Sequence, residues 1–104
     1  TCEALWMGVP VLTLAGTEHR SRVGVSLLSA IDQPGWIARN EDELVRIAVE
    51  MAANPAGLDL IRRGLRGRMQ ASPLLDHAGQ AARFGAALRE CWSAWCDRAN
   101  GKAA

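Results

Sequence analysis

Thr1 and Glu3 are the first residues whose types and spacing could do chemistry, because they begin a short segment, 1–7, that favours a helix. Amides and hydroxyls at a helix start bind phosphate oxygens, and a carboxylate accepts hydrogen bonds from both hydroxyls of a ribose diol. The pair would therefore suit a ligand that carries a diphosphate and a ribose. A glutamate in a first helical turn is also commonly a surface residue that complements the helix dipole. The residues alone leave both interpretations open.

Other reactive side chains favour structural roles. His77 follows Asp76 at an expected helix start, where capping explains both residues. The three cysteines contain no C-x-x-C pair and are too few for a disulfide framework, so reduced thiols of a cytoplasmic protein are expected. We expect no metal site. The tryptophans at helical positions are predicted to serve the core or a contact between lobes rather than to stack on a sugar, and the arginines of one basic run are predicted to fan around a solvated helix surface (Trp6, Trp92 and Trp95; Arg62, Arg63, Arg66 and Arg68).

The first half of the chain alternates between helical and strand patterns. The helix over 1–7 should end at Gly8, and the apolar, β-branched run 9–14 predicts a strand buried on both faces. Ser21 is predicted as the N-cap of a helix to about residue 31, which a turn at 32–35 and a short strand at 36–38 follow.

The second half is helical throughout. Asn40 and Glu43 predict a capping box before an apolar stripe at 44, 47, 48 and 51, and a second stripe at 58, 61, 65 and 69 follows Pro55. A last long helix over about 76–98 carries large apolar residues at 84, 88, 92 and 95.

This order predicts an α/β fold with parallel strands that is helix-rich at its C-terminal end. Two strands are too few for a stable parallel sheet, so we expect residues 1–104 to be one fragment whose remaining strands lie upstream. The net charge of +1 argues against a nucleic-acid partner. The chain has no apolar run of the roughly 20 residues that a membrane helix needs, so no membrane contact is expected.

Several motifs occur in the order and spacing of one known family. The stretch from Cys2 to Leu14 closely resembles the C-terminal catalytic region of the O-GlcNAc transferase family, including its bacterial and SPINDLY-like members. The segment 21–28 resembles the family's next helix, Trp36-Ile37-Ala38 its short strand, and Arg66 to Asp76 its R-x-R-x-x-x-S-P-L-x-D stretch. Trp92-Ser93-Ala94-Trp95 resembles its closing tryptophan pair, so the likeness covers nearly the whole chain.

The resemblance implies the two-lobed GT-B fold, of which this chain would be an incomplete, Rossmann-like C-terminal half that binds the nucleotide sugar. Glu3 falls where the family has an acid, commonly Asp, that contacts the ribose, and Thr1 ends the turn that faces the diphosphate. The earlier hydroxyl residues of that turn, an upstream lysine and histidine, and the N-terminal lobe are expected to precede this chain.

The loop before residue 23 leaves two interpretations for each of its candidates. In the family this loop lies beside the active-site cleft, so Arg22 could help to form the donor pocket, and His19 could do acid–base work. Alternatively, Arg22 makes a structural salt bridge and His19 faces solvent.

The resemblance implies transfer of a sugar, GlcNAc from UDP-GlcNAc, to Ser/Thr hydroxyls of a protein, without a metal or other cofactor. The expected partners are the nucleotide sugar, the protein acceptor and the N-terminal lobe of the same chain. The isolated chain is expected to be inactive, and no catalytic residue is predicted. The alternatives are a non-catalytic remnant or interaction domain, and a GT-B transferase that uses another nucleotide sugar.

Overall fold

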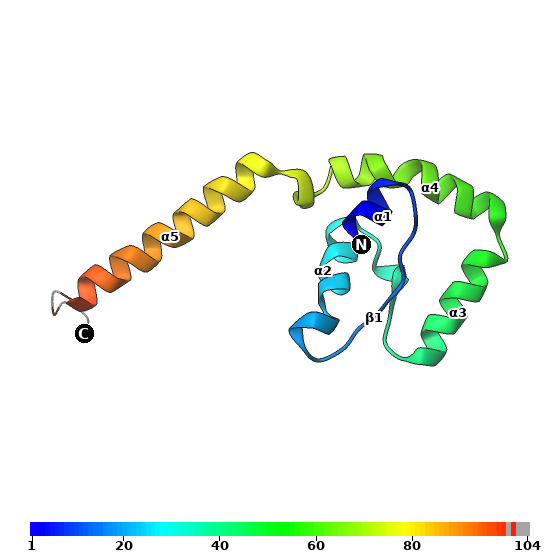
Figure 1. The fold of residues 1–104 in the computed structure, drawn as a ribbon, viewed down its shortest axis with the longest axis horizontal. Helices are drawn as coiled ribbons and strands as arrows, with labels where there is room; N and C mark the ends of the chain where they lie inside the picture. The colour runs from blue at the N-terminus through cyan, green and yellow to red at the C-terminus, as the bar shows by residue number, and fades with distance from the viewer. Residues whose placement is uncertain (100, 102–104) are drawn as a thin grey trace.

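The computed structural model describes residues 1–99 and 101, in which short strands and 3-10 turns separate five helices (Figure 1). The elements are α1 (Cys2–Trp6), β1 (Thr13–Leu14), η1 (His19–Ser21), α2 (Val23–Ala30), η2 (Pro34–Trp36), β2 (Ile37–Ala38), α3 (Glu41–Ala52), α4 (Pro55–Gln70), η3 (Pro73–Leu75) and α5 (His77–Ala99).

The two strands form a small parallel sheet with α2 in the connection between them. Thr13 lies opposite Ile37 and Leu14 opposite Ala38. The prediction of parallel strands in a helix-rich chain is therefore confirmed. Both strands are shorter than predicted, because β1 pairs only with β2 within the described residues and because Trp36 belongs to the 3-10 turn η2.

The core lies where α1, α2 and α4 meet. Its buried side chains are those of Leu5, Leu28, Ile31, Trp36, Leu65 and Met69. The predicted stripe of α4 is confirmed, with Leu65 and Met69 buried and the other two positions half-buried. In α3, Ile47 is buried but Ala48 is exposed, so this helix covers the core with a narrower face than predicted.

Most predicted helix ends are confirmed. Gly8 adopts φ 76°, and the amides of Gly8 and Val9 donate to the carbonyls of Leu5 and Ala4, which is the Schellman arrangement that ends a helix. Asn40 caps α3 by accepting from the Glu43 amide at 2.8 Å.

The prediction for Ser21 is wrong. Its hydroxyl donates to the Glu18 carbonyl and accepts from the Glu18 amide, which closes η1 instead of capping α2. Arg22 occupies the N-cap position of α2 and makes no side-chain capping bond there. The turn η1 competes with α2 for the Ser21 hydroxyl, because Glu18 lies only three residues before Ser21.

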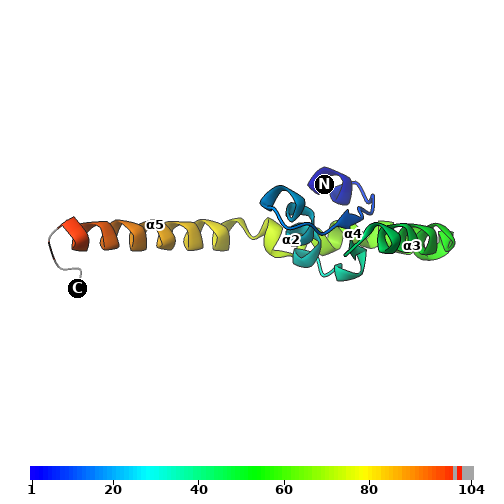
Figure 2. The same cartoon turned by 90° about the horizontal axis from the view of Figure 1, so that it is seen from below.

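Helix α5 extends away from the rest of the chain as a straight rod (Figures 1 and 2). The radius of gyration is 19.2 Å, compared with about 13 Å for a compact domain of this length. None of its described residues is buried, and Trp92 and Trp95 stack on each other with ring centroids 5.2 Å apart. Within the described residues, the prediction that Trp92 and Trp95 could lie in the core is therefore wrong. Among all the residues that the structure describes, no helix is long and apolar enough to cross a membrane.

Candidate functional site

The amino-terminal turn of α1 brings Thr1 and Glu3 together. The Glu3 side chain is 95% exposed and that of Thr1 is 32% exposed. Thr1 is the N-cap residue, but its side chain makes no capping hydrogen bond. Both side chains are thus accessible to a ligand.

An open hollow of about 400 Å³ lies beside this turn, which is within the size range of small-molecule sites. Its lining is mostly apolar and comes from α1, α4 and η3: Cys2, Glu3, Trp6, Met7, Met69 and Leu75. Glu3 is the only carboxylate in this lining. The hollow could accept an apolar ring face while Glu3 binds hydroxyl groups at its rim.

The opposite end of α1 is bound by two arginines from α4. Arg62 Nε donates to the Gly8 carbonyl at 3.1 Å, and Arg66 Nε donates to the Trp6 carbonyl at 3.0 Å. The Arg66 guanidinium also lies over the Trp6 ring, 5.1 Å from its centroid. Arg62 and Arg66 are exposed, as predicted for the basic run, but they also bind α1, which the prediction did not include. Arg63 is also exposed, and within the described residues it pairs with Asp59 of the same helix.

The loop after β1 holds Arg22 in a structural contact. Arg22 Nη1 donates to the Gly16 carbonyl at 3.1 Å, so its partner is a backbone oxygen and not the carboxylate of the predicted salt bridge. Within the described residues, no hydrogen bond or ion pair joins Arg22 to Thr1 or Glu3. His19 is exposed, as the structural alternative predicts. A place for Arg22 in a donor pocket stays a prediction.

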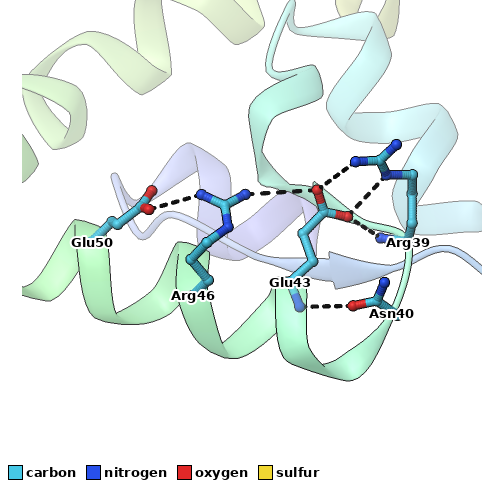
Figure 3. Close-up of polar contacts among 5 residues, drawn as sticks. All are labelled: Arg39, Asn40, Glu43, Arg46 and Glu50. Carbon is cyan, nitrogen blue, oxygen red and sulfur yellow. Dashed lines mark hydrogen bonds and ion pairs between the residues drawn. The ribbon is translucent and has the colours of Figure 1, made fainter.

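The chain leaves β2 through Arg39 and Asn40, which lie at the same carboxyl edge of the sheet as the loop that contains Arg22. Ligands of open parallel sheets bind at this edge. Here Glu43 accepts from the Arg39 amide at 2.7 Å and from the Arg39 guanidinium at 3.1 Å, and Arg46 bridges Glu43 to Glu50 (Figure 3). Only half of the predicted capping box is confirmed: Asn40 caps the Glu43 amide, but Glu43 accepts from the amide of Arg39 and not from that of Asn40.

The two arginines stabilise the ionised Glu43. The hydrogen bonds from the Arg39 side chain and then from its amide, together with the charges of Arg39 and Arg46, lower the pKa of Glu43 to about 2. The carboxylate is only 17% exposed, and its neighbours occupy both of its oxygens. We therefore assign this cluster to fixing the start of α3 rather than to ligand binding.

Asp76 has a similar structural role at the start of α5. It accepts from the Gly79 amide at 2.9 Å and pairs with Arg83 at 3.2 Å, and these contacts lower its pKa. Capping at this position, predicted for the neighbourhood of His77, is confirmed. In the part of the chain that the structure describes, no three His, Cys, Asp or Glu side chains form a group that could hold a metal ion.

Comparison with known proteins places these features in one family. The sequence model of the family "Glycosyl transferase family 41" matches residues 1–83. This range includes every contact between α1 and α4 described above. The chain belongs to glycosyltransferase family 41. Its predicted family is therefore confirmed.

Several similar proteins come from plants. The chain is 41% identical over 97 residues to a protein of Petunia hybrida, and 41% identical to one of Solanum lycopersicum over the same length. A protein of Arabidopsis thaliana is 40% identical over 96 residues. Each is described as a probable UDP-N-acetylglucosamine–peptide N-acetylglucosaminyltransferase SPINDLY. Likeness to a bacterial-type member stays a prediction.

The matches cover 92–93% of this chain but only 10% of the length of each relative. This family 41 chain is thus similar to a glycosyltransferase region.

Sequence patterns missed the roles of Arg62 and Arg66, although a signal was present. Residues four apart on a helix share one face, and this spacing separates the pair from Arg63.

Proposed function

We propose that this chain forms part of the donor-binding lobe of a two-lobed GT-B glycosyltransferase that transfers GlcNAc from UDP-GlcNAc to Ser/Thr hydroxyls of proteins. The observation that carries the proposal is the likeness over 93% of the chain to proteins named for this activity. The short parallel sheet flanked by helices is consistent with part of such a lobe.

The proposed chemistry uses Glu3 as the acceptor for the ribose hydroxyls and Thr1 as a hydroxyl beside the diphosphate. In an inverting transfer, the acceptor hydroxyl oxygen attacks the anomeric carbon and gives up its proton to a base, while the bond to the diphosphate oxygen breaks and the diphosphate leaves with the electron pair. Dipoles and donors that are already in place stabilise the negative charge that develops on it. Arg22 is a further candidate for this site, and we assign no catalytic residue to the chain.

The proposal includes a cytoplasmic, metal-independent enzyme whose N-terminal lobe completes the site. Three free thiols agree with a reducing compartment. The exposed, ligand-accessible Glu3 carboxylate gives the nucleotide a contact that needs no bridging cation.

The test is UDP binding by calorimetry, with the 104-residue chain and with a form extended at its amino-terminal side to two-lobed length. We expect binding by the extended form only, since the phosphate-facing turn would then be complete. Absence of binding by both would contradict the catalytic proposal and favour an interaction domain.

A transfer assay separates the remaining alternative. The extended form should transfer GlcNAc from UDP-GlcNAc to a peptide that contains Ser and Thr, with mass spectrometry as the readout. Transfer from a different nucleotide sugar alone would keep the glycosyltransferase and overturn the proposed donor.

A further inference from the structure

Helix α1 is too short to fix its own orientation. It has only five residues, whereas isolated helices need about 12–15 residues to be even marginally stable in water. The amides of Met7, Gly8 and Val9 satisfy the carbonyls of Glu3, Leu5 and Ala4, and the Trp6 carbonyl is left for a partner elsewhere in the fold. The position of Glu3 therefore depends on what binds the rest of α1.

Helix α4 supplies these contacts at the carboxyl end of α1. Arg66 binds the Trp6 carbonyl and covers the Trp6 ring, and Arg62 binds the Gly8 carbonyl. The two backbones also meet directly, since a Cβ on Gly8 would lie 2.8 Å from the Arg62 carbonyl oxygen. Leu5, which is fully buried, anchors the same helix in the core.

The two guanidinium groups also match the electrostatics of α1. Cations stabilise the carboxyl end of a helix, where the dipole is negative. The other end carries Glu3, whose side chain is 95% exposed and makes no hydrogen bond within the described residues. The arginines thus act on Glu3 only through the backbone of α1.

We propose that Arg62 and Arg66 are positioning residues of the donor site, which set where Glu3 meets the ribose diol. This inference rests on the proposed function, because it takes Glu3 as the ribose contact. Arg63 provides a matched control, since it lies on the same helix and pairs with Asp59, and among the described residues no hydrogen bond or ion pair joins it to α1.

The experiment compares the affinities of UDP and 2′-deoxy-UDP for the two-lobed protein by calorimetry. The ratio of the two affinities isolates the contact with the 2′-hydroxyl, and a general loss of folded protein would not change it. One hydrogen bond to a charged group predicts a preference for UDP of roughly tenfold to a hundredfold in the unchanged protein. Glu3→Ala should abolish this preference.

Arg66→Ala and Arg62→Ala should each reduce the preference several-fold, and Arg63→Ala should leave it unchanged. Arg66→Lys keeps the charge but lacks the planar fork, so it should restore only part of the preference. This variant decides the result if the alanine variant fails to fold.

Two outcomes separate the inference from the proposed function. If Glu3→Ala abolishes the preference while the Arg62 and Arg66 variants retain it in full, the positioning role is overturned and the donor contact stands. If Glu3→Ala leaves the preference unchanged, the proposed ribose contact itself fails, and the positioning role fails with it.

Discussion

At the scale of single residues, Glu3 provides the most direct test of the donor contact. In the two-lobed protein, Glu3→Ala should weaken UDP binding by about 1–3 kcal/mol, because a charge-assisted pair of hydrogen bonds to the diol would be lost. Calorimetry measures this loss. Glu3→Asp is the matched variant, since it keeps the carboxylate and shortens the side chain by one methylene. It should retain most of the affinity.

The thermal midpoint should stay the same in both Glu3 variants, because the side chain is 95% exposed. Unchanged UDP affinity in the alanine variant, with the fold intact, would remove Glu3 from the site.

Glu43 predicts how the stability of the chain depends on pH. Its pKa is about 2 in the folded chain and lies near 4.5 in an unfolded chain, so folding favours the ionised form. The resulting stabilisation is fully present above about pH 4.5 and is lost as the pH falls towards 2. Urea unfolding at steps from pH 7 to pH 2 should show this loss.

Glu43→Gln should lower the stability at pH 7 and remove its own part of the decline below pH 4.5. Arg39→Ala should shrink the same part of the decline, because the side-chain hydrogen bond from Arg39 is the largest cause of the shift. Arg63→Ala lies outside this cluster and serves as the control. If all variants and the unchanged chain have the same acid profile, the cluster contributes no pH dependence.

At the scale of elements, Gly8 joins the end of α1 to the backbone of α4. Gly8→Ala should destabilise the chain by at least about 1–2 kcal/mol, because φ is 76° and the new Cβ would meet the Arg62 carbonyl at 2.8 Å. Gly67→Ala is the matched control. Gly67 has open space around its Cβ position within α4, so this change should stabilise the chain by about 0.5–1 kcal/mol. Urea unfolding that gives the same sign for both variants would contradict this account.

Local patterns predicted the elements better than the contacts between them. The apolar stripe of α4 and the cap at Asn40 depend on neighbours within four residues, and each is observed. Ser21 was predicted wrongly because a second local turn competed for the same hydroxyl.

The candidate site depends on contacts that the local pattern does not contain. Arg66 and Trp6 are 60 residues apart in sequence, so only the packing of α4 against α1 brings them together. The types of Thr1 and Glu3 suggested a ligand, but nothing near them in sequence indicated which residues would hold their helix.

At the scale of the whole molecule, the chain combines a small core with a long uncovered helix. The core residues come from α1 to α4 and the turns between them, and α5 contributes none. Four large apolar side chains of α5 are each 56–64% exposed: Phe84, Leu88, Trp92 and Trp95. They recur every three or four residues, so they form one continuous apolar stripe. Exposed stripes of this kind promote association.

Replacing the four stripe residues by Gln should therefore separate association from folding. Sedimentation velocity should show that the unchanged chain self-associates and that the fourfold variant does so less. The free energy of unfolding in urea, followed by tryptophan fluorescence, should change by no more than about 0.5 kcal/mol, the range of ordinary surface substitutions, because no stripe residue belongs to the described core. A large drop in this free energy would mean that α5 folds back onto the core in solution, and the rod of Figure 1 would then not describe the chain there.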